Sequence, residues 1–242
     1  MERKEILPES PQNHIRIKPG IFNPRRYYLK KLLALVQIAR DQFIEKKYSL
    51  DNKITLCDYG CGTMPYITLF PKQYVDYKGI DLSWNPHADF YIENNKIQMP
   101  DITADVVLST QVLEHVEDYN TYLQEAYRIL KDDGILVLTT HGYWMFHPDP
   151  TDYWRWTSDG LKKIIQDQHF EIIYFDGIIA RGAMGMQLIQ DGFYFKLPKV
   201  IRPLFGGIMQ TFVALLDKLS SHNARITDAC TYLVVAKKKT NI

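Results

Sequence analysis

Apolar and polar positions follow two different periods along most of the chain. Over residues 25–47 apolar residues recur every three or four positions with charged residues between them, which predicts an amphipathic helix. Similar stripes predict helices over 113–131 and 158–168. Short apolar runs predict strands at 54–59, 77–81, 88–92, 104–109, 135–139, 170–175 and 231–236. Strands separated by helices predict an α/β fold with a doubly wound, mostly parallel sheet.

Two segments depart from this alternation. Prolines punctuate residues 1–24, which predicts an extended arm. Residues 177–229 form an insert before the last strand, at 230–238, and leave the direction of that strand open. One broad apolar face predicts a helix over 197–219 within this insert. We therefore expect a single domain with its core at 54–176, covered by the N-terminal helix and carrying a helical insert.

The first predicted strand ends in a turn rich in glycine. Residues 58–65 are Asp-Tyr-Gly-Cys-Gly-Thr-Met-Pro, and ligands of open α/β sheets lie where the strands end. A dinucleotide-binding turn would have a third glycine where Pro65 stands, and a P-loop would continue with Gly-Lys-Ser or Gly-Lys-Thr. Asp58 would repel a phosphate by about 4 kcal/mol at a separation of about 4 Å. The turn therefore favours a ligand that carries positive charge.

A second acid follows at the offset expected for ribose binding. The next strand ends in Asp81, about 20 residues after the turn. A carboxylate there can accept hydrogen bonds from two vicinal ribose hydroxyls. The two acids and the turn predict an adenosine ligand with a cationic tail, and S-adenosylmethionine has both parts. A nicotinamide cofactor is the alternative.

These residues belong to a longer pattern. Residues 54–140 resemble the class I S-adenosylmethionine-dependent methyltransferases of the small-molecule group, through segments 58–62, 79–82, 105–107, 112–116 and 128–136. The resemblance implies a Rossmann-like fold and S-adenosylmethionine as cofactor. The cofactor-binding residues that it implies are Asp58, Gly60, Cys61, Gly62, Asp81, Leu82, Asn94, Ser109, Thr110 and Gln111. Met64 departs from the pattern, because many members carry a third glycine there.

An aromatic loop follows the fifth predicted strand. Residues 147–157 are similar to a loop of bacterial methyltransferases from surface-polysaccharide and other glycan pathways. In one interpretation the loop binds a sugar through Tyr153, Trp154 and Arg155, since aromatic rings pack on sugar faces and arginine binds carboxylate or phosphate. In the other, the loop packs on itself and is held by an ion pair between Asp152 and Arg155.

Methylation of an oxygen atom also requires a proton acceptor. The candidates for this catalytic role are His115, His141 and His147, with Asp152 behind them. The alternative for His115 is a packing or capping role beside Glu114 at a helix start. Neighbouring residues of a helix point about 100° apart, so we expect these two to bind no metal ion together, and no metal site at all.

Composition narrows the choice of partners. The chain has 29 Lys and Arg against 28 Asp and Glu, a net charge of +1, whereas nucleic-acid binding by phosphate neutralisation favours a basic excess. Three cysteines argue against a disulfide framework. Since no signal peptide or membrane span is evident, we expect a cytoplasmic protein and no nucleic-acid partner.

The insert has two interpretations. The helix predicted at 197–219 is either a lid over the substrate pocket or a peripheral contact with a membrane or partner. Lys196, Lys199 and Arg202 precede its uncharged run, as basic anchors of an interfacial helix do. That run, 203–216, is too short to span a bilayer.

The sequence as a whole predicts a methyltransferase that uses S-adenosylmethionine to O-methylate a sugar, a glycan precursor or another small molecule. The alternative is a non-catalytic module that binds the cofactor within a biosynthetic assembly. Neither interpretation fixes the oligomeric state.

Overall fold

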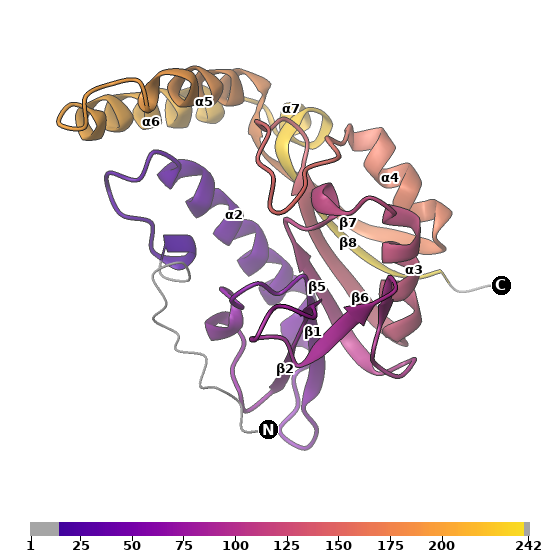
Figure 1. Cartoon of the computed structure of the whole chain (residues 1–242). Helices are drawn as coiled ribbons and strands as arrows, with labels where there is room; N and C mark the ends of the chain where they lie inside the picture. Colours follow the sequence, from indigo (N-terminus) through magenta and orange to yellow (C-terminus); the bar gives the residue numbers. More distant parts are fainter. Residues whose placement is uncertain (1–14, 240–242) are drawn as a thin grey trace.

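An eight-stranded sheet runs through the computed structural model, which describes residues 15–239 (Figure 1). The strands are β1 (Ile54–Tyr59), β2 (Val75–Leu82), β3 (Phe90–Glu93), β4 (Lys96–Ile97), β5 (Ala104–Thr110), β6 (Leu130–His141), β7 (Phe170–Ala180) and β8 (Ala229–Lys238). Their order is β4-β3-β2-β1-β5-β6-β8-β7. Neighbouring pairs from β3 to β6 are parallel, while β4 and β8 run antiparallel to their neighbours. The strand order reverses at β1, which confirms the predicted doubly wound sheet.

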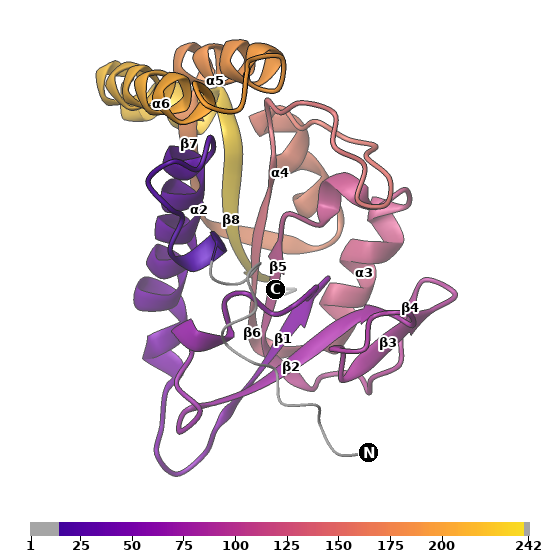
Figure 2. The ribbon, with the colours of Figure 1, turned by 60° about the vertical axis from the view of Figure 1, so that its left-hand side comes forward.

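Helices cover both faces of the sheet (Figure 2). They are α2 (Arg26–Ala39), α3 (Tyr119–Ile129), α4 (Ser158–Asp167), α5 (Arg181–Tyr194), α6 (Arg202–Leu219) and α7 (His222–Thr227), with short turns at Arg40–Ile44, Glu45–Lys47, Ile67–Leu69 and Leu113–His115. Helix α2 packs on one face and helices α3 and α4 on the other.

Alternate strand residues supply the two cores. Leu56 and Val106 face α2, whereas their neighbours Cys57 and Val107 face α3, and all four are fully buried. Strands buried on both faces have continuous apolar runs, which is why periodicity located them. The three cysteines, Cys57, Cys61 and Cys230, are buried and unbridged.

The helix predicted over 113–131 is wrong at both ends. Only a short turn forms at Leu113–His115, and α3 begins at Tyr119, because the Asp118 side chain accepts a hydrogen bond from the Thr121 amide and caps the helix there. Leu130 is extended and pairs with Ala104, so β6 begins at once, before the predicted strand at 135–139. The apolar stripe continued across this boundary, and periodicity could not locate it.

The N-terminal cover follows its prediction more closely. The helix predicted over 25–47 is α-helical to Ala39 and continues as a π-helical and a 3₁₀ turn to Lys47. The arm predicted over 1–24 lies outside the described residues as far as residue 14, and residues 15–17 are helical.

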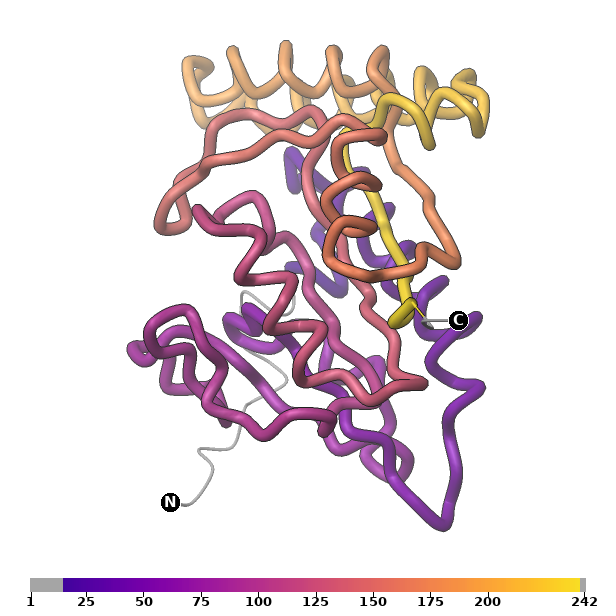
Figure 3. The backbone as a smooth tube through the Cα atoms, turned by 90° about the vertical axis from the view of Figure 1, so that its right-hand side faces the viewer, coloured from indigo at the N-terminus to yellow at the C-terminus, as the bar shows by residue number. Residues whose placement is uncertain are grey.

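The insert contains more structure than predicted. Strand β7 continues to Ala180, and helices α5 and α7 were not expected. Helix α6 begins at Arg202 rather than at residue 197, with Pro203 in its first turn, where a missing amide proton costs nothing. Strand β8 is antiparallel to both neighbours, which settles the direction left open. Helices α5 and α6 lie side by side across one end of the molecule (Figures 1 and 3). Within residues 15–239 no helix has both the length and the hydrophobicity to cross a membrane.

Candidate active site

The predicted site residues gather mainly at the carboxyl ends of β1, β2, β5 and β6. They fall into two groups, which we call the acidic turn and the histidine cluster. The acidic turn consists of Asp58, residues 60–64 and Asp81. The histidine cluster consists of Glu114, His115, His141 and His147.

The conformation of the acidic turn depends on glycine. Gly60 and Gly62 have φ angles of +82° and +51°, where side chains with a Cβ are strained. A Cβ at Gly60 would lie 2.4 Å from a methyl carbon of Val112, whereas a Cβ at Gly62 would have no atom within 4 Å. The backbone at Gly62 therefore faces open space that a ligand can fill.

The structure shows how the fold accommodates Met64, the residue at which the chain departs from the family pattern. Its φ angle is +52°, so this position has the left-handed conformation that a third glycine would adopt easily. The side chain is fully buried, and its Cε occupies the space that a Cβ at Gly79 would fill. Packing against Gly79 thus accommodates the methionine.

Asp58 is almost fully buried. Its Oδ2 accepts a hydrogen bond from the Tyr77 hydroxyl at 2.6 Å, while Oδ1 has no hydrogen-bond partner within residues 15–239. Burial raises the pKa of Asp58 to about 7, and Asp81 adds to this, while Tyr77 and Arg16 act in the opposite direction. A cationic group beside Oδ1 would favour the ionised form.

Asp81 is hydrogen-bonded to the turn itself. Its Oδ2 accepts from the Gly62 amide at 2.9 Å and from Asn85 Nδ2 at 2.6 Å, and Asn85 also donates to the Gly62 carbonyl. Cys61 Sγ lies 3.9 Å from the same oxygen. Sequence reasoning missed Asn85, although an Asn-Pro pair three residues after a strand end is a recognisable turn signal.

The other predicted cofactor residues have different surroundings. Leu82 is partly exposed beside Asp81, and Asn94 lies in the turn between β3 and β4 with a φ angle of +51°. Ser109 is fully buried, and its hydroxyl pairs with that of Tyr122 on α3.

Gln111 connects the site to the N-terminal cover helix. Thr110, the last residue of β5, is buried, and Gln111 follows it with a φ angle of +58°. The Gln111 Oε1 accepts a hydrogen bond from the Tyr28 hydroxyl at 2.7 Å, and its Nε2 donates to Thr139. Helix α2 therefore closes one side of this region.

Arg16 is a further residue that sequence reasoning missed. Its guanidinium hydrogen-bonds with Tyr66 and interacts electrostatically with Tyr28 and Asp58. The N-terminal segment thus places a cation beside the acidic turn. No sequence signal pointed to it, since it is one arginine in a segment punctuated by prolines.

Glu114 is fully buried at the centre of the histidine cluster. Its Oε2 accepts a hydrogen bond from Thr140 at 2.8 Å, while Oε1 accepts none and lies 3.3 Å from His141 Nε2. Burial raises the pKa of Glu114 to about 6, against the hydrogen bonds from its own backbone and Thr140.

His141 is buried, unlike the two other histidines. Its ring stacks on Trp144 at 4.7 Å, and its Nδ1 lies 3.2 Å from Thr231 Oγ1. Burial lowers its pKa well below the usual 6.5, so the imidazole is neutral. We interpret His141 as a residue that orients Glu114.

His115 and His147 are half-buried and face each other, with ring centroids 4.9 Å apart. The Nδ1 of His115 contacts the Thr151 carbonyl, and that of His147 lies 3.3 Å from the Met145 carbonyl. A carbonyl can only accept, so each Nδ1 carries a proton, and in a neutral imidazole this leaves the lone pair on Nε2. The structure thus holds two imidazoles as proton acceptors or ligands.

Asp152 holds the loop that carries His147. Its two carboxylate oxygens each accept from Arg155 at 2.6 Å, Oδ2 also accepts from the His147 amide, and this oxygen lies 3.5 Å from His147 Nδ1. Burial alone would raise the pKa of Asp152, but the hydrogen bonds from Arg155 and the His147 amide lower it to about 2.

The guanidinium of Arg155 is fully engaged inside the loop. Besides Asp152, it donates to the carbonyls of Trp144, Met145 and Trp154. This favours the second interpretation given above, an internally packed loop, over a substrate-binding arginine.

The aromatic residues of the loop divide into two sets. Trp154 and Trp156 pack edge-on against Tyr119, and Trp154 Nε1 donates to the Val116 carbonyl. Tyr143, Phe146 and Tyr153 are exposed and remain available to a ligand.

The expectation that Glu114 and His115 bind no metal ion together considered these two residues alone, and the fold brings a third potential ligand to them. One potential ligand atom each from Glu114, His115 and His147 lies within 4.8 Å of the others. The side chains of Glu114 and His115 come from adjacent residues, and the loop after β6 brings His147 close to both of them.

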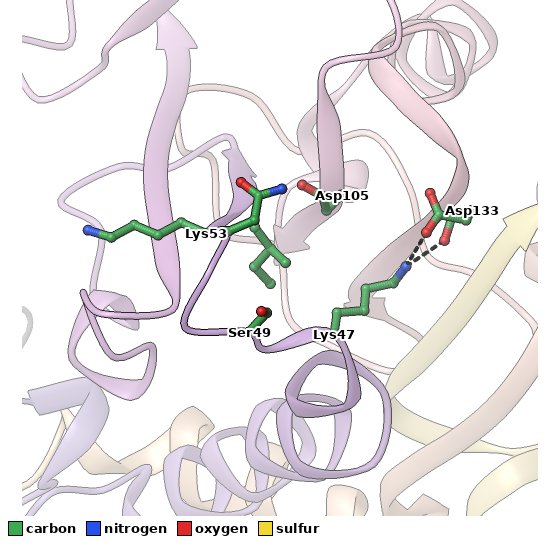
Figure 4. A pocket seen from close by; sticks show the side chains of 7 residues that line it. Lys47, Ser49, Lys53, Asp105 and Asp133 are labelled. Atoms are coloured by element: carbon green, nitrogen blue, oxygen red, sulfur yellow. Dashed lines mark hydrogen bonds and ion pairs between the residues drawn. The ribbon is translucent and has the colours of Figure 1, made fainter.

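A hollow of about 230 Å³ lies at the opposite end of the sheet (Figure 4). Its lining includes Lys47, Asp105 and Asp133. Lys47 Nζ lies 3.1 Å from Asp133 Oδ2, and Lys131 Nζ lies 2.9 Å from both oxygens of Asp105. The two acids here are paired with lysines of the chain, and none of the predicted site residues lies there.

Comparison with known proteins gives a consistent result. A family model described as a methyltransferase domain matches residues 25–173. The chain is 26% identical over 128 residues to the malonyl-[acyl-carrier protein] O-methyltransferase of Bacillus anthracis, covering 46% of each chain. It is 28% identical over 133 residues to the ubiquinone biosynthesis O-methyltransferase of Pelagibacter ubique, covering 49% of this chain and 53% of that protein. The chain thus spans about half the length of these curated relatives.

Solved structures show the same fold. The [4+2]-cyclase SpnF superposes with a TM-score of 0.55 at 18% identity, covering 87% of this chain and 81% of that one. Phosphoethanolamine N-methyltransferase 2 of Haemonchus contortus, in complex with S-adenosyl-L-methionine, has a TM-score of 0.51 at 13% identity, covering 95% and 60% of the two chains. Identities this low establish the fold and not the reaction.

Proposed function

The chain belongs to the methyltransferase-domain family, with S-adenosylmethionine as its cofactor, and we propose that it transfers the cofactor's methyl group to a hydroxyl oxygen of a small molecule. The match to the family model supports the cofactor and the reaction class. The histidine cluster supports the choice of oxygen, because a hydroxyl must lose its proton when it is methylated.

The acidic turn fits the cofactor by charge and by space. Gly62 faces open space, and Asp58 has a buried oxygen without a hydrogen-bond partner. Asp58 and Arg16 together offer both signs of charge, which matches the ammonium and carboxylate of the methionine part. Asp81 would take the ribose hydroxyls. The bound cofactor supplies a methyl group on a sulfonium, an electrophile that the protein does not have to activate further.

The chain's own contribution is to position the acceptor and take its proton. The contacts of His115 and His147 with backbone carbonyls are the single observation that carries the proposal, since they place a proton on each Nδ1 and leave Nε2 of the neutral ring as the acceptor. Asp152 holds His147 in place, and Glu114 lies beside His141 in the buried part of the cluster. A base at hydrogen-bond distance contributes about 10²–10⁴-fold to rate, and alignment of the reactants contributes more.

A sugar or glycan precursor is the acceptor that we favour. The exposed rings of Tyr143, Phe146 and Tyr153 lie on the loop that carries His147, and aromatic faces suit the apolar faces of sugars. Trp154 and Arg155 are engaged inside the loop, so we assign them to its support.

Product formation tests the proposal. The purified chain, given methyl-labelled S-adenosylmethionine, is incubated with sugars, lipid-linked sugars and phenols, and S-adenosylhomocysteine and the labelled acceptor are measured. We expect turnover with a hydroxylated acceptor, and a decrease of about 10²–10⁴-fold for His147→Ala. The matched control, His222→Ala, changes an exposed histidine on α7 and should retain full rate.

The competing function is a non-catalytic module that binds the cofactor. Saturable binding of S-adenosylmethionine with no labelled product from any acceptor or cell extract would favour that module. Turnover that is unchanged in both His115→Ala and His147→Ala would contradict the role assigned to the cluster.

A further inference from the structure

We propose that Glu114, His115 and His147 form a binding site for one divalent transition-metal ion, which holds the acceptor through two adjacent oxygens. The proposal deepens the proposed function and rests on it for the identity of the acceptor. Its first support is convergence, since potential ligand atoms of the three residues lie within 4.8 Å of one another.

A buried oxygen without a partner points to a cation. Glu114 is fully buried, and its Oε1 accepts no hydrogen bond within the described part of the chain, although His141 Nε2 lies 3.3 Å from it. A buried carboxylate oxygen left without a partner is costly. Burial also prevents bulk water from satisfying it, so an ion bound beside His115 and His147 would complete its coordination.

The surroundings already orient each ligand. His115 and His147 present Nε2 because backbone carbonyls hold their Nδ1 protons, and Asp152 Oδ2 lies 3.5 Å from His147 Nδ1. Thr140 holds the other oxygen of Glu114 at 2.8 Å. Carbonyls, carboxylates and hydroxyls behind the ligands are the usual supports of a metal-binding histidine or carboxylate.

The donor set selects the ion and the acceptor. Two imidazoles and one carboxylate suit zinc, iron, manganese or cobalt rather than calcium or magnesium. Ligand atoms around tetrahedral zinc lie about 3.4 Å apart, as bonds of about 2.1 Å require, so side-chain shifts of about 1 Å would close the site. Three protein ligands leave open positions, which a vicinal diol or a catechol can fill with both oxygens.

With an ion bound, His115 and His147 would be its ligands and no longer proton acceptors, and the ion would take over the activation of the hydroxyl. Coordination lowers the pKa of the bound hydroxyl, its O–H bond breaks and the proton passes to water. The oxygen then forms its new bond to the methyl carbon as the bond from carbon to sulfur breaks.

Metal binding can be measured without turnover. The chain is stripped with EDTA and titrated with Zn²⁺ by calorimetry and with Co²⁺ by visible absorption. We expect one ion per chain, with at least tenfold weaker binding in His147→Ala and in Glu114→Gln. The exposed His222→Ala variant should bind as the parent does. If Glu114→Gln fails to fold, His147→Ala decides, because this side chain lies on a loop and is 27% exposed.

The outcomes separate the two proposals. No saturable binding, or binding insensitive to His147→Ala, overturns the metal site. Full turnover of the EDTA-treated chain overturns it too and leaves the methyl-transfer function standing. If one ion binds per chain but no diol or catechol is methylated, the metal site is supported and the proposed function is contradicted.

A different observation carries a second inference: we infer that the hairpin of α5 and α6 docks on an anionic lipid surface. On α6 the side chains facing the protein body include Met209 and Val213, which are buried. The outer face of α6 is apolar and exposed over its whole length, and its members are Leu204, Ile208, Phe212, Leu215 and Leu219. The tip adds Phe195 and Val200, which are 70% and 86% exposed.

The charges on the hairpin favour an anionic surface. Its exposed charged residues, within 181–219, are Arg181, Lys196, Lys199 and Lys218. The two acids of the hairpin point elsewhere, since Asp217 is fully buried near Lys31 and Arg225 and Asp191 accepts from Gln187. An amphipathic segment with an apolar face and basic flanks is the type that binds in the lipid interface.

The position of the hairpin connects it to the site. Helix α5 begins directly after β7, whose carboxyl end lies at the same edge of the sheet as that of β6, because both strands are antiparallel to β8. Figure 3 shows the hairpin across this end of the molecule. An acceptor anchored in lipid would thus meet the loop that carries His147.

Vesicle sedimentation tests the lipid contact. We expect binding to phosphatidylcholine vesicles that contain phosphatidylglycerol, weaker binding at high salt, and at least tenfold weaker binding in the double variant Ile208→Glu, Leu215→Glu. Leu50→Glu, which changes an exposed leucine outside the hairpin, is the control and should bind normally. No binding to anionic vesicles overturns the inference. So does a stable dimer that the same double variant dissociates, because the occupant would then be a second copy of this chain.

Discussion

Two buried acids at the carboxyl ends of the strands differ from the acids at the amino ends in their hydrogen bonds. At the amino ends of the strands, Asp105 accepts hydrogen bonds from the Thr55 amide and Lys131, and Asp133 from Lys47 (Figure 4). At the carboxyl ends, Asp58 and Glu114 are buried, and among the described residues each has one oxygen that accepts no hydrogen bond, although His141 Nε2 lies 3.3 Å from that of Glu114. Unpaired buried charge destabilises a fold. The two buried oxygens that accept no hydrogen bond thus lie among the predicted site residues, and the acids of the opposite end do not share this feature.

The largest expected effect is on Glu114. Glu114→Gln keeps the shape and an acceptor for Thr140 but removes the charge, and we expect turnover to decrease by about 10²–10⁴-fold. Steady-state rates of S-adenosylhomocysteine formation measure this. The matched change at the other end, Asp133→Asn, should alter the rate by less than twofold. Equal losses from both variants would remove the distinction between the two ends.

Asp58→Asn should weaken S-adenosylmethionine binding by about 10–100-fold, the equivalent of about 1.4–2.7 kcal/mol for a lost charged interaction. Calorimetric titration measures the affinity. In the parent protein the affinity should fall as the pH falls below about 7, because Asp58 becomes protonated there. The variant should lack this pH dependence.

Although Asp58→Asn should weaken cofactor binding, it should increase the stability of the fold at high pH. The pKa of Asp58 is about 7 in the folded chain, compared with 3.8 for an unperturbed aspartate such as that of the unfolded chain. The folded state therefore binds the proton more tightly. Its contribution to stability is full below about pH 4 and is lost as the pH rises to about 7. We expect Asp58→Asn to be more stable than the parent at pH 8 and equal to it at pH 4, as measured by urea unfolding. If the variant were less stable than the parent at pH 8, this would contradict the claim that the ionised, buried Asp58 destabilises the fold.

A smaller effect is expected at Gly62. Gly62→Ala should destabilise the fold by about 1–2 kcal/mol, because its φ angle of +51° is strained for alanine although no atom obstructs the methyl group. Gly60→Ala adds a clash with Val112 and should destabilise more. Thermal unfolding of the pair distinguishes backbone strain from steric overlap, and identical losses would show that overlap is irrelevant.

The smallest effect is expected for the ion pair of Lys47 and Asp133. The Asp133 side chain is 79% exposed, and exposed pairs contribute about 0–1 kcal/mol. Lys47→Met should therefore change the free energy of unfolding by less than about 1 kcal/mol, and high salt should reduce the difference further. A loss of several kcal/mol would mean that this end of the sheet depends on its charges as much as the site does.

The sequence predicted the acidic turn well because its signals are local. Asp58, Gly60 and Gly62 are nearly consecutive, and the turn's backbone shape is a property of the glycines themselves. Asp81 follows at a short offset because a connection with a single 3₁₀ turn, Ile67–Leu69, separates the two parallel strands. Asn85 and Arg16 were missed, since their contacts with the turn depend on how a loop and the N-terminal segment fold back.

Predictions for the histidine cluster were less complete. The residue types were identified, but their separate roles were not. His141 proved to be buried against Trp144, while His115 and His147 face each other from segments 32 residues apart. Arg155 was considered for substrate binding, and only the structure placed all of its nitrogens within the loop.

The sequence by itself determined the layered α/β fold, the positions of the strands along the chain and the acid-flanked glycine turn. Periodicity and glycine conformation act between near neighbours, so these features can be predicted from short segments. Tertiary structure alone decided that Glu114, His115 and His147 converge and that α6 keeps an exposed apolar face. Both depend on where crossover connections return the chain, and no short-range preference of the residues specifies that.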